Sequence, residues 1–389
     1  MGNREPYQFR LPPVIYVGEG ASNVVGQEAT HLGAEKVLVV TDEKLVQMGH
    51  LDPIEKGLRS SGIEFEVYEG VTTEPTVRHV EEGLRLLKES GCNAIVTLGG
   101  GSPIDAGKGI AAMANNPGAI RDYMGMGKLP APGVPLIAVP TTAGTGSEVT
   151  KFTVITDTET NVKMLIGSNY VIPEVALVDP LLTLTMPQDV TAATGIDALT
   201  HAIEAYVSKR AQPISDVLAL SAIKLIASNL RQSWWDNENL QARSHVMLGA
   251  HQAGMAFSNA SVALVHGMSR PIGAYFHVSH GLSNASLLSA VIAFSLPSAP
   301  ERYGDIAAAM GEDIGGRSTM EAARASVDAV TSLCEDIKIP KLRDLGVEET
   351  KLKAHGAQMA EDALASGSPD NNPQKASKEE IIELYWEAF

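Results

Sequence analysis

The spacing of apolar positions changes along the chain. Through about residue 180, short runs rich in Val and Ile alternate with stretches of helical spacing. Six of these runs are predicted to be strands, at residues 14–17, 36–42, 65–68, 94–101, 136–142 and 175–180. Strands that alternate with helices in this way form a parallel sheet with both faces covered. The first half is therefore expected to be a Rossmann-like α/β domain with a parallel sheet.

The second half has no comparable strand pattern. Long segments rich in Ala, Leu and Met, such as residues 214–230 and 243–257, space their apolar side chains three and four apart and predict helices. We expect a domain of residues 1–184 that binds a dinucleotide and an all-helical, metal-binding domain of residues 185–389. Pro187 is expected as the first residue of a helix, and Ser377 with Glu380 as a capping box.

Composition excludes several function classes. The 389 residues are 44% hydrophobic and 20% charged, which is typical of a soluble globular protein. A formal net charge of -16 argues against nucleic-acid and anionic-membrane partners. We find no signal segment and no uninterrupted apolar run of the roughly 20 residues that span a bilayer, so a cytoplasmic protein is expected. Cys92 and Cys334 are expected to be reduced core residues.

A glycine-rich turn follows the run at 94–98. Gly99, Gly100, Gly101 and Ser102 precede a helical pattern opened by Pro103. Glycines allow close approach of a pyrophosphate, and free N–H groups at a helix N-terminus favour negative charge. The same residues also suit a tight turn between a strand and a helix without any ligand. The turn is thus a candidate phosphate site.

Polar side chains follow two other predicted strands. Asp42 could accept a ribose 2′-OH and repel a 2′-phosphate, which favours NAD over NADP, or it could cap the helix that follows. The stretch 140–150 carries the hydroxyls of Thr141, Thr142, Thr145 and Ser147. Ligands of α/β sheets bind at the carboxyl ends of strands, so both segments are candidates for cofactor binding.

One carboxylate and three imidazoles have spacings that suit a metal. Asp197 and His201 are four residues apart, so on a helix they share one face, whereas His266 and His280 must come from other elements. The first two could instead form a hydrogen-bonded surface pair, but an unpaired carboxylate in this apolar neighbourhood would be costly. Pro271 is expected to bend or end the helix of His266. Three imidazoles and a carboxylate suit Fe(II) or Zn(II), and a site open to substrate favours iron.

Four motifs occur in order on the chain: GGGSPID, PTTAGTGSE, DALTHAIEAY and HGMSRPIGAYFHVSHGLSNA. With them the sequence resembles the iron-containing (group III) alcohol dehydrogenase family over essentially its whole length. The resemblance implies the dehydroquinate synthase-like fold of that family, with an N-terminal α/β domain and an all-α C-terminal domain. It also implies one Fe2+, or zinc in some members, held by Asp197, His201, His266 and His280.

The resemblance also implies cofactor contacts and an assembly. A homodimer formed through an N-terminal segment is usual in the family, and residues 11–21 fit that segment. Asp42 would set the preference for NAD. The remaining cofactor-binding residues would be Gly99, Gly100, Gly101, Ser102 and Asp105 at the pyrophosphate, Thr141, Thr142 and Ser147 at the adenosine and ribose, and Lys163 at the nicotinamide ribose.

The chain departs from the family pattern at two positions. Arg270 stands where many members carry a second histidine that is a candidate proton relay, and an arginine cannot act as a general base. His277 is then a candidate for the proton route. Arg270 itself could bind an anionic group of the substrate, or it could pair with an acidic residue or the cofactor phosphates. Glu74 stands where the family commonly has asparagine.

The sequence therefore predicts an NAD-dependent, metal-dependent oxidoreductase acting on CH–OH groups. It would transfer a hydride reversibly between nicotinamide C4 and a small alcohol or aldehyde, one that carries an anionic group if Arg270 binds the substrate. One alternative is a zinc enzyme similar to glycerol dehydrogenase or dehydroquinate synthase. A second alternative is a non-catalytic sensor that binds NAD and metal.

Overall fold

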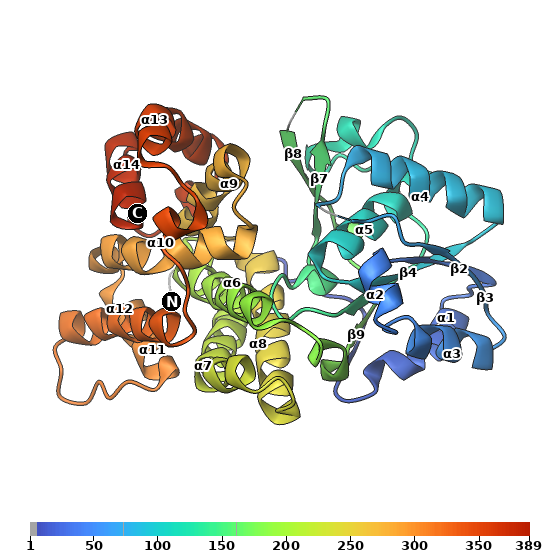
Figure 1. Ribbon diagram of the computed structural model, residues 1–389, viewed down its shortest axis with the longest axis horizontal. Coiled ribbons are helices and arrows are strands. Elements are labelled where there is room, and N and C mark those ends of the chain that lie inside the picture. Colours follow the sequence, from blue (N-terminus) through green and yellow to red (C-terminus); the bar gives the residue numbers. More distant parts are fainter. Residues whose placement is uncertain (1–5, 73, 161) are drawn as a thin grey trace. The chain divides into compact units, whose positions relative to one another are not determined.

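The chain is described by a computed structural model for residues 6–72, 74–160 and 162–389. It divides into two compact units, with a border between Thr185 and Met186, and residues 6–9 group with the second unit. All strands of the described residues belong to the first unit. In Figure 1 the first unit runs from blue to green and the helical unit from green to red.

A six-stranded parallel sheet forms the centre of the first unit (Figure 1). All six strands predicted from the apolar runs are present, so the predicted fold class is confirmed. The strand order is β1-β9-β6-β4-β2-β3. The bounds are β1 (Val14–Val17), β2 (Lys36–Val40), β3 (Glu64–Tyr68), β4 (Ala94–Gly99), β6 (Leu136–Pro140) and β9 (Val175–Val178).

The four inner strands of the sheet, β9, β6, β4 and β2, are buried on both faces, which is why they are continuous apolar runs. Successive side chains of a strand point to opposite faces, so Val37 and Val39 enter one core while Leu38 and Val40 enter the other. The first core is shared with helices α1 (Val25–His31) and α3 (Asp52–Ser60). The second is shared with α4 (Val77–Ser90) and α5 (Gly101–Asn115). A short helix, α2 (Glu43–Gln47), follows β2.

A second sheet of three strands was not predicted. It has the order β5-β8-β7, with bounds β5 (Gly125–Met126), β7 (Phe152–Asp157) and β8 (Val162–Gly167). Ile155 and Met164 of this sheet join the core beneath α5. The prediction missed it because β7 alternates buried and exposed positions instead of forming an apolar run, and β5 is only two residues long.

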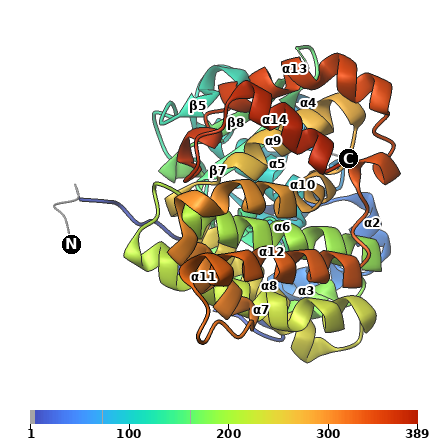
Figure 2. The ribbon, with the colours of Figure 1, turned by 90° about the vertical axis from the view of Figure 1, so that its left-hand side faces the viewer.

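The secondary-structure elements of the second unit are all helices in the part of the chain that the structure describes. Its central helix, α6 (Gln188–Val207), is buried along almost its whole length and packs against α7 (Pro213–Trp235), α8 (Leu240–Ala260) and α10 (His280–Ser295). Figure 2 shows α6 among its neighbours. The other helices are α9 (Leu264–Phe276), α11 (Pro300–Met310), α12 (Thr319–Asp336), α13 (Glu349–Ala365) and α14 (Lys378–Glu387).

Short 3-10 turns connect these elements in both units. They are Ala21–Val24, Ile120–Tyr123, Ser147–Val149, Asn169–Val171, Pro180–Thr183, Leu296–Ser298, Leu342–Leu345 and Pro369–Asn371.

Three local predictions can be compared with the helix ends. The capping box of Ser377 and Glu380 is confirmed at the start of α14. Pro187 precedes the first residue of α6, because its extended backbone (φ -59°, ψ 155°) places it at the N-cap. Pro271 lies inside α9 and does not end it, since the helix continues for five more residues to Phe276.

Two helical segments are long and apolar enough to cross a membrane by length and composition. They are Pro213–Trp235 and His280–Ser298, and 39% and 50% of their apolar windows are buried inside the fold. The core helices of soluble proteins pass the same test, so these segments are weak evidence for a membrane span.

Candidate metal centre and its surroundings

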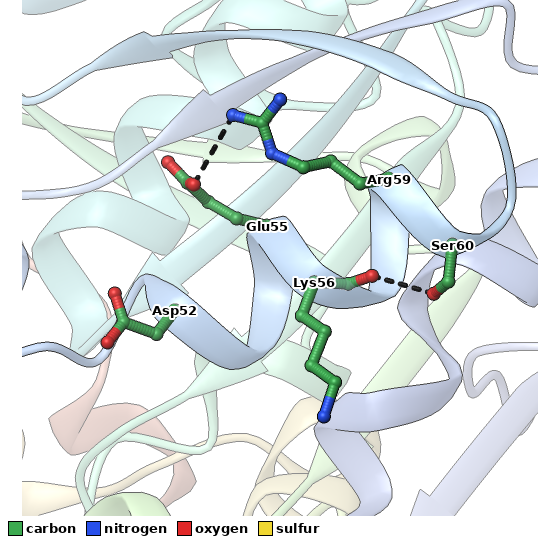
Figure 3. A pocket seen from close by; sticks show the side chains of 5 residues that line it. All are labelled: Asp52, Glu55, Lys56, Arg59 and Ser60. Carbon is green, nitrogen blue, oxygen red and sulfur yellow. Dashed lines mark hydrogen bonds and ion pairs between the residues drawn. The ribbon is translucent and has the colours of Figure 1, made fainter.

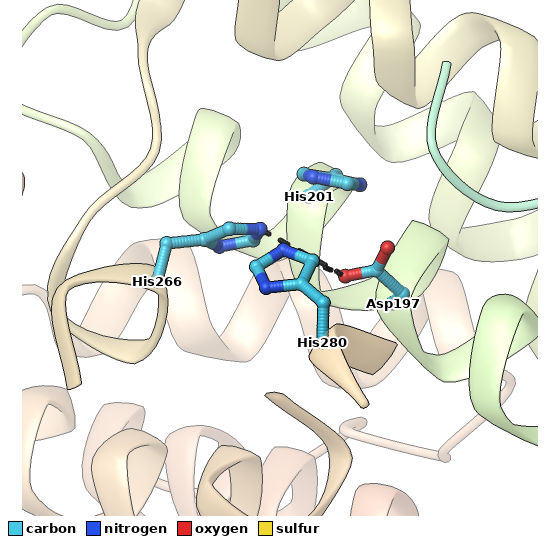
Figure 4. Close-up of side chains that lie close together, drawn as sticks. All are labelled: Asp197, His201, His266 and His280. Atoms are coloured by element: carbon cyan, nitrogen blue, oxygen red, sulfur yellow. Dashed lines mark ion pairs between the residues drawn. The ribbon is translucent and has the colours of Figure 1, made fainter. Parts of the chain in front are cut away.

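Three helices of the second unit bring together the four residues predicted to hold a metal. Asp197 and His201 lie one turn apart on α6, His266 lies in the first turn of α9, and His280 is the first residue of α10. One donor atom from each residue lies within 4.8 Å of all the others (Figure 4). Oδ1 of Asp197 is 3.8 Å from Nε2 of His266 and 3.9 Å from Nε2 of His280.

The cluster is closed on one side and open on the other. Asp197, His201 and His266 are buried, whereas the His280 side chain is 44% exposed. A buried carboxylate among neutral rings is costly without a cation. The exposed fourth residue leaves a side from which a small molecule can approach.

Glu204, which the sequence analysis missed, orients His266. Its Oε2 atom lies 2.6 Å from Nδ1 of His266 and accepts a hydrogen bond from the N–H of that nitrogen. The carboxylate also accepts backbone N–H groups of Ala263, Val265 and His266 at 2.9, 2.6 and 3.4 Å. A carboxylate that holds Nδ1–H leaves Nε2 as a lone-pair donor directed at the cluster.

Burial sets the charge states of this pair. It raises the pKa of Glu204 to about 7, although the backbone N–H donors oppose that shift. Burial also lowers the pKa of His266 to about 4, so the ring is neutral near pH 7. A neutral imidazole is the form that coordinates a metal.

The ring of His201 is held by stacking. It lies between the rings of Phe257 and His266, with centroid distances of 4.1 and 4.5 Å and interplanar angles of 15° and 27°. This packing limits rotation of the ring, so the direction of its nitrogens is set by α6, α8 and α9 together.

Asn284 is the second residue that the sequence analysis missed. Its Nδ2 atom is 2.6 Å from Oδ1 of Asp197 and 3.2 Å from Nε2 of both His266 and His280. Its Oδ1 atom is buried and has no hydrogen-bond partner in the described part of the chain. Two amide hydrogens cannot serve three converging acceptors fully. The cluster therefore presents more acceptor capacity than its own donors can satisfy, which fits a divalent cation.

Helical spacing is the signal that could have revealed both residues. Glu204 lies three residues after His201, and Asn284 lies four residues after His280, so each shares a helix face with a proposed ligand. Neither residue type is unusual in a helix, and only the packing shows what each side chain contacts.

The two candidate catalytic residues occupy different positions. Arg270 is partly buried on α9, one turn after His266, and its positive charge is among the causes that lower the pKa of His266. His277 is exposed and ends α9 in a left-handed conformation with φ 59°. The described residues record no contact between His277 and the four clustered residues, so its role in proton transfer stays a prediction.

In the first unit, the predicted phosphate site lies at the carboxyl edge of the sheet. Gly99 ends β4 with φ +153°, and Gly100 immediately precedes α5. A Cβ on Gly101 would lie 3.0 Å from Cγ2 of Thr145. The adjacent strand delivers Thr141 to the same edge, where its N–H donates to the carbonyl of Gly99 at 3.0 Å. The turn therefore exposes the N-terminus of α5 without Cβ atoms in the way.

Two predicted cofactor residues form a bond within the protein. The hydroxyl of Ser147 donates to Oδ1 of Asp105 at 2.5 Å, and the other Asp105 oxygen accepts the N–H of Val154 at 2.9 Å. Burial raises the pKa of Asp105, which the nearby Lys108 charge and these hydrogen bonds oppose. These contacts tie α5 to the segments on either side of residue 150, and a direct role at a pyrophosphate stays a prediction.

Lys108 supports the same region and was not singled out from the sequence. Its Nζ atom is fully buried and donates to Thr150 Oγ1 at 3.0 Å, and to the carbonyls of Thr150 and Phe152 at 3.0 and 2.8 Å. Desolvation lowers the pKa of Lys108 to about 8. The side chain fastens the middle of α5 to the start of β7.

Asp42 and Lys163 already have partners. Asp42 caps α2, because its Oδ1 accepts the N–H of Leu45 at 3.0 Å. This is the capping role that the sequence left open, and it leaves the other carboxylate oxygen for a ribose. Lys163 on β8 forms an ion pair with Glu74 at 2.6 Å. The predicted contact of Lys163 with the nicotinamide ribose is therefore in competition with Glu74.

Thr142 and Ser102 are both partly buried at this edge. A Cβ on Gly100 would lie 3.2 Å from Cγ2 of Thr142, so the two segments are in close contact. The structure thus brings Ser102 and Thr142 to the edge where the cofactor was expected, and their contacts with it stay predictions.

A surface pocket on α3 is lined by none of the candidate site residues. It is lined by Asp52, Glu55, Lys56, Arg59 and Ser60 (Figure 3). Glu55 pairs with Arg59 at 3.5 Å, and the Ser60 hydroxyl donates to the carbonyl of Lys56 at 2.6 Å. These contacts within one helix are typical of a solvated face.

Two family models match the chain. Residues 12–180 match the iron-containing alcohol dehydrogenase model, and residues 191–389 match the C-terminal model of the Fe-containing alcohol dehydrogenase family.

Similar proteins span the whole chain. The 1,3-propanediol dehydrogenase of Klebsiella pneumoniae is 44% identical over 386 residues, which cover 98% of this chain and 99% of the relative. A crystal structure of a 1,3-propanediol oxidoreductase superimposes with a TM-score of 0.96 at 44% identity, covering 99% of this chain and 100% of the other. The sulfoacetaldehyde reductase of Bifidobacterium kashiwanohense, solved with NAD+, has a TM-score of 0.89 at 28% identity, covering 99% of each chain.

Proposed function

The chain belongs to the iron-containing alcohol dehydrogenase family, and we propose that it interconverts small alcohols and aldehydes with NAD and a divalent ion, Fe2+ in preference to Zn2+. Members of this family are oxidoreductases that act on CH–OH groups, and the activity of the chain is of this class. In the reductive direction an aldehyde, NADH and one proton yield the alcohol and NAD+. The convergence of Asp197, His201, His266 and His280 is the observation that carries the proposal.

The metal would be held by these four residues. A divalent ion supplies Lewis-acid chemistry at the alcohol or carbonyl oxygen, and the nicotinamide accepts or supplies the hydride. Glu204 keeps His266 in the tautomer that presents Nε2, and Asn284 orients the Asp197 carboxylate through a 2.6 Å hydrogen bond. Four protein ligands saturate a tetrahedral zinc, whereas iron accepts further ligands, which supports the preference for Fe2+.

The cofactor would be held by the first unit. The N-terminus of α5 after Gly99, Gly100 and Gly101 supports binding of the pyrophosphate, because free N–H groups and the helix dipole favour negative charge. Asp42 lies at the same edge and supports NAD over NADP through repulsion of a 2′-phosphate.

The test is metal analysis of anaerobically purified protein together with an NADH oxidation screen over short aldehydes. We expect about one ion per chain, loss of turnover after chelation and recovery on addition of Fe2+. Asp197→Asn should lose both the ion and the turnover, whereas Glu335→Gln, an exposed change on α12, should keep both. Turnover that is unaffected by complete removal of metal would overturn the proposal.

The comparisons do not favour the two alternatives. A synthase regenerates its NAD within each cycle, so net oxidation of NADH by simple aldehydes would exclude it. A non-catalytic sensor would bind metal and NAD without turnover in the same screen.

We propose that the protein is cytoplasmic and that it forms a homodimer. β1 is an edge strand of the large sheet, and Val14 and Val17 at its ends are exposed. An exposed apolar edge strand can pair with a second copy. Light scattering of the wild type and of Val17→Lys would test this, since a charge on the edge should shift a dimer towards monomers.

A further inference from the structure

Arg270 has no hydrogen-bond acceptor among the residues that the structure describes. The guanidinium is partly buried on α9, and burial is the main cause that lowers its pKa. Within the described residues it forms no hydrogen bond and no ion pair. Five N–H donors of a cation that water only partly reaches are costly to leave unsatisfied. An anion from outside the chain would satisfy these N–H donors.

Glu204 is the nearby carboxylate, but its oxygens are already occupied. Oε1 accepts the N–H groups of Val265 and His266, and Oε2 accepts the N–H of Ala263 and Nδ1–H of His266. These four contacts use the lone-pair directions of the carboxylate. Glu204 thus exerts a long-range attraction on Arg270 without forming an ion pair with it.

The position of Arg270 links it to the proposed reaction site. It follows His266 by four residues on α9, so the two side chains share a helix face. Its positive charge also reaches His280 of α10, where it is among the causes that lower the pKa. An anion bound by Arg270 would therefore lie beside the clustered residues, on the side where His280 is exposed.

The charge of the whole protein makes this local cation significant. A net charge of -16 repels small anions in general. Among the described residues Arg270 has no hydrogen-bond or ion-pair partner, and beside a divalent ion held by a single clustered carboxylate its guanidinium would create a local positive region in that field. Planar guanidinium groups bind carboxylate, sulfonate and phosphonate oxygens in a bidentate manner.

We propose that Arg270 is a specificity-determining residue that binds the anionic group of the substrate, and that the preferred substrates are short aldehydes carrying a carboxylate, sulfonate or phosphonate. This inference rests on the proposed aldehyde reductase function. It assigns to Arg270 a contact with substrate, in place of the proton transfer that an arginine cannot perform.

The test compares matched aldehydes with wild type, Arg270→Ala and Arg270→Lys. Sulfoacetaldehyde and succinic semialdehyde are the anionic members, and propanal and butanal are the neutral ones. We expect Arg270→Ala to lose at least about 30-fold in kcat/KM on the anionic aldehydes and less than about threefold on the neutral ones. Arg270→Lys should fall between, because it keeps the charge without the bidentate geometry. Arg78→Ala, an exposed arginine on α4, is the matched control.

A binding measurement separates substrate from cofactor as the source of the anion. Calorimetric titration of isethionate, the alcohol of sulfoacetaldehyde, into enzyme saturated with NADH should show binding that is lost in Arg270→Ala. The Kd of NADH should be the same in both proteins. A higher Kd of NADH in the variant, with unchanged isethionate binding, would assign the contact to a cofactor phosphate and overturn the proposal.

Two failures are distinguishable. If the wild type reduces neutral and anionic aldehydes equally well and Arg270→Ala affects both to the same degree, the specificity role is wrong while the dehydrogenase function stands. If the metal-loaded wild type reduces no aldehyde of either kind, the proposed function itself fails.

Discussion

Nδ1 of His266 lies 2.6 Å from Oε2 of Glu204, and both side chains are buried. The imidazole joins α9 to α6, and the same carboxylate accepts the backbone N–H groups that begin α9. One side chain therefore sets both the start of α9 and the tautomer of a proposed metal ligand. A group with these two tasks is a positioning residue of the metal centre.

Removal of the Glu204 charge should weaken metal binding. In Glu204→Gln the amide would present N–H groups to backbone N–H donors, so His266 loses its fixed orientation. We expect the affinity for Zn2+ or Co2+ to fall by about 10- to 100-fold, measured by competition with a chromogenic chelator. The exposed Glu335→Gln should bind as wild type does. Equal affinities in all three proteins would show that helix packing alone orients His266.

Asn284→Asp should make stability depend more strongly on metal. In the wild type, Nδ2 of Asn284 lies 2.6 Å from Oδ1 of Asp197. The substitution would place a second carboxylate oxygen close to that atom. Repulsion of like charges should lower the Tm of the metal-free protein by about 3–8 °C, and a divalent ion should recover more than that loss. Scanning calorimetry with and without Co2+ measures both values.

Asn284→Ala is the matched control, because it removes the hydrogen bond without adding charge. Its Tm should fall without an increased response to metal. A metal response in Asn284→Asp no larger than that of the wild type would contradict the placement of residue 284 beside the ion.

Asp42→Asn should relax the choice of cofactor without loss of the helix cap. Asparagine caps helices as well as aspartate, so the bond to the N–H of Leu45 should persist. Loss of the charge should raise kcat/KM for NADPH relative to NADH by at least about tenfold. Steady-state kinetics with both cofactors, and an unchanged midpoint of urea unfolding, check the two parts. A ratio identical to that of the wild type would leave Asp42 as a cap only.

Lys108 should produce a stability change at alkaline pH. Its pKa is about 8 in the folded protein and 10.5 in the reference state, so between these values the unfolded chain binds a proton that the folded chain lacks. The free energy of unfolding therefore rises with pH across this window. Below pH 8 the destabilisation caused by burying the charged Lys108 is constant. Between pH 8 and pH 10, the free energy of unfolding of the wild type should rise by about 2 kcal/mol relative to that of Lys108→Met.

Urea unfolding of both proteins at several pH values measures this difference. Lys56→Met, an exposed lysine on α3, should show no such dependence relative to the wild type. A difference between wild type and Lys108→Met that stays flat from pH 8 to pH 10 would mean that Lys108 remains charged in the folded protein.

The sequence by itself determined the class of the fold. Parallel strands that are buried on both faces need continuous Val and Ile runs, and this local requirement is visible without any contact information. The placement of Asp197 and His201 on one helix face was equally local, because residues four apart in a helix lie one turn from each other. The cap formed by Ser377 and Glu380 belongs to the same kind of short-range signal.

Only the tertiary structure decided how the metal centre is built. His266 and His280 are 65 and 79 residues from His201, so their convergence depends on the packing of three helices. Glu204 and Asn284 are ordinary helix residues in sequence, and their importance follows from atoms that packing brings within hydrogen-bond distance. The proposed role of Arg270 also depends on tertiary structure, because only the packing shows that the oxygens of nearby Glu204 bind other groups and that no described residue pairs with the guanidinium.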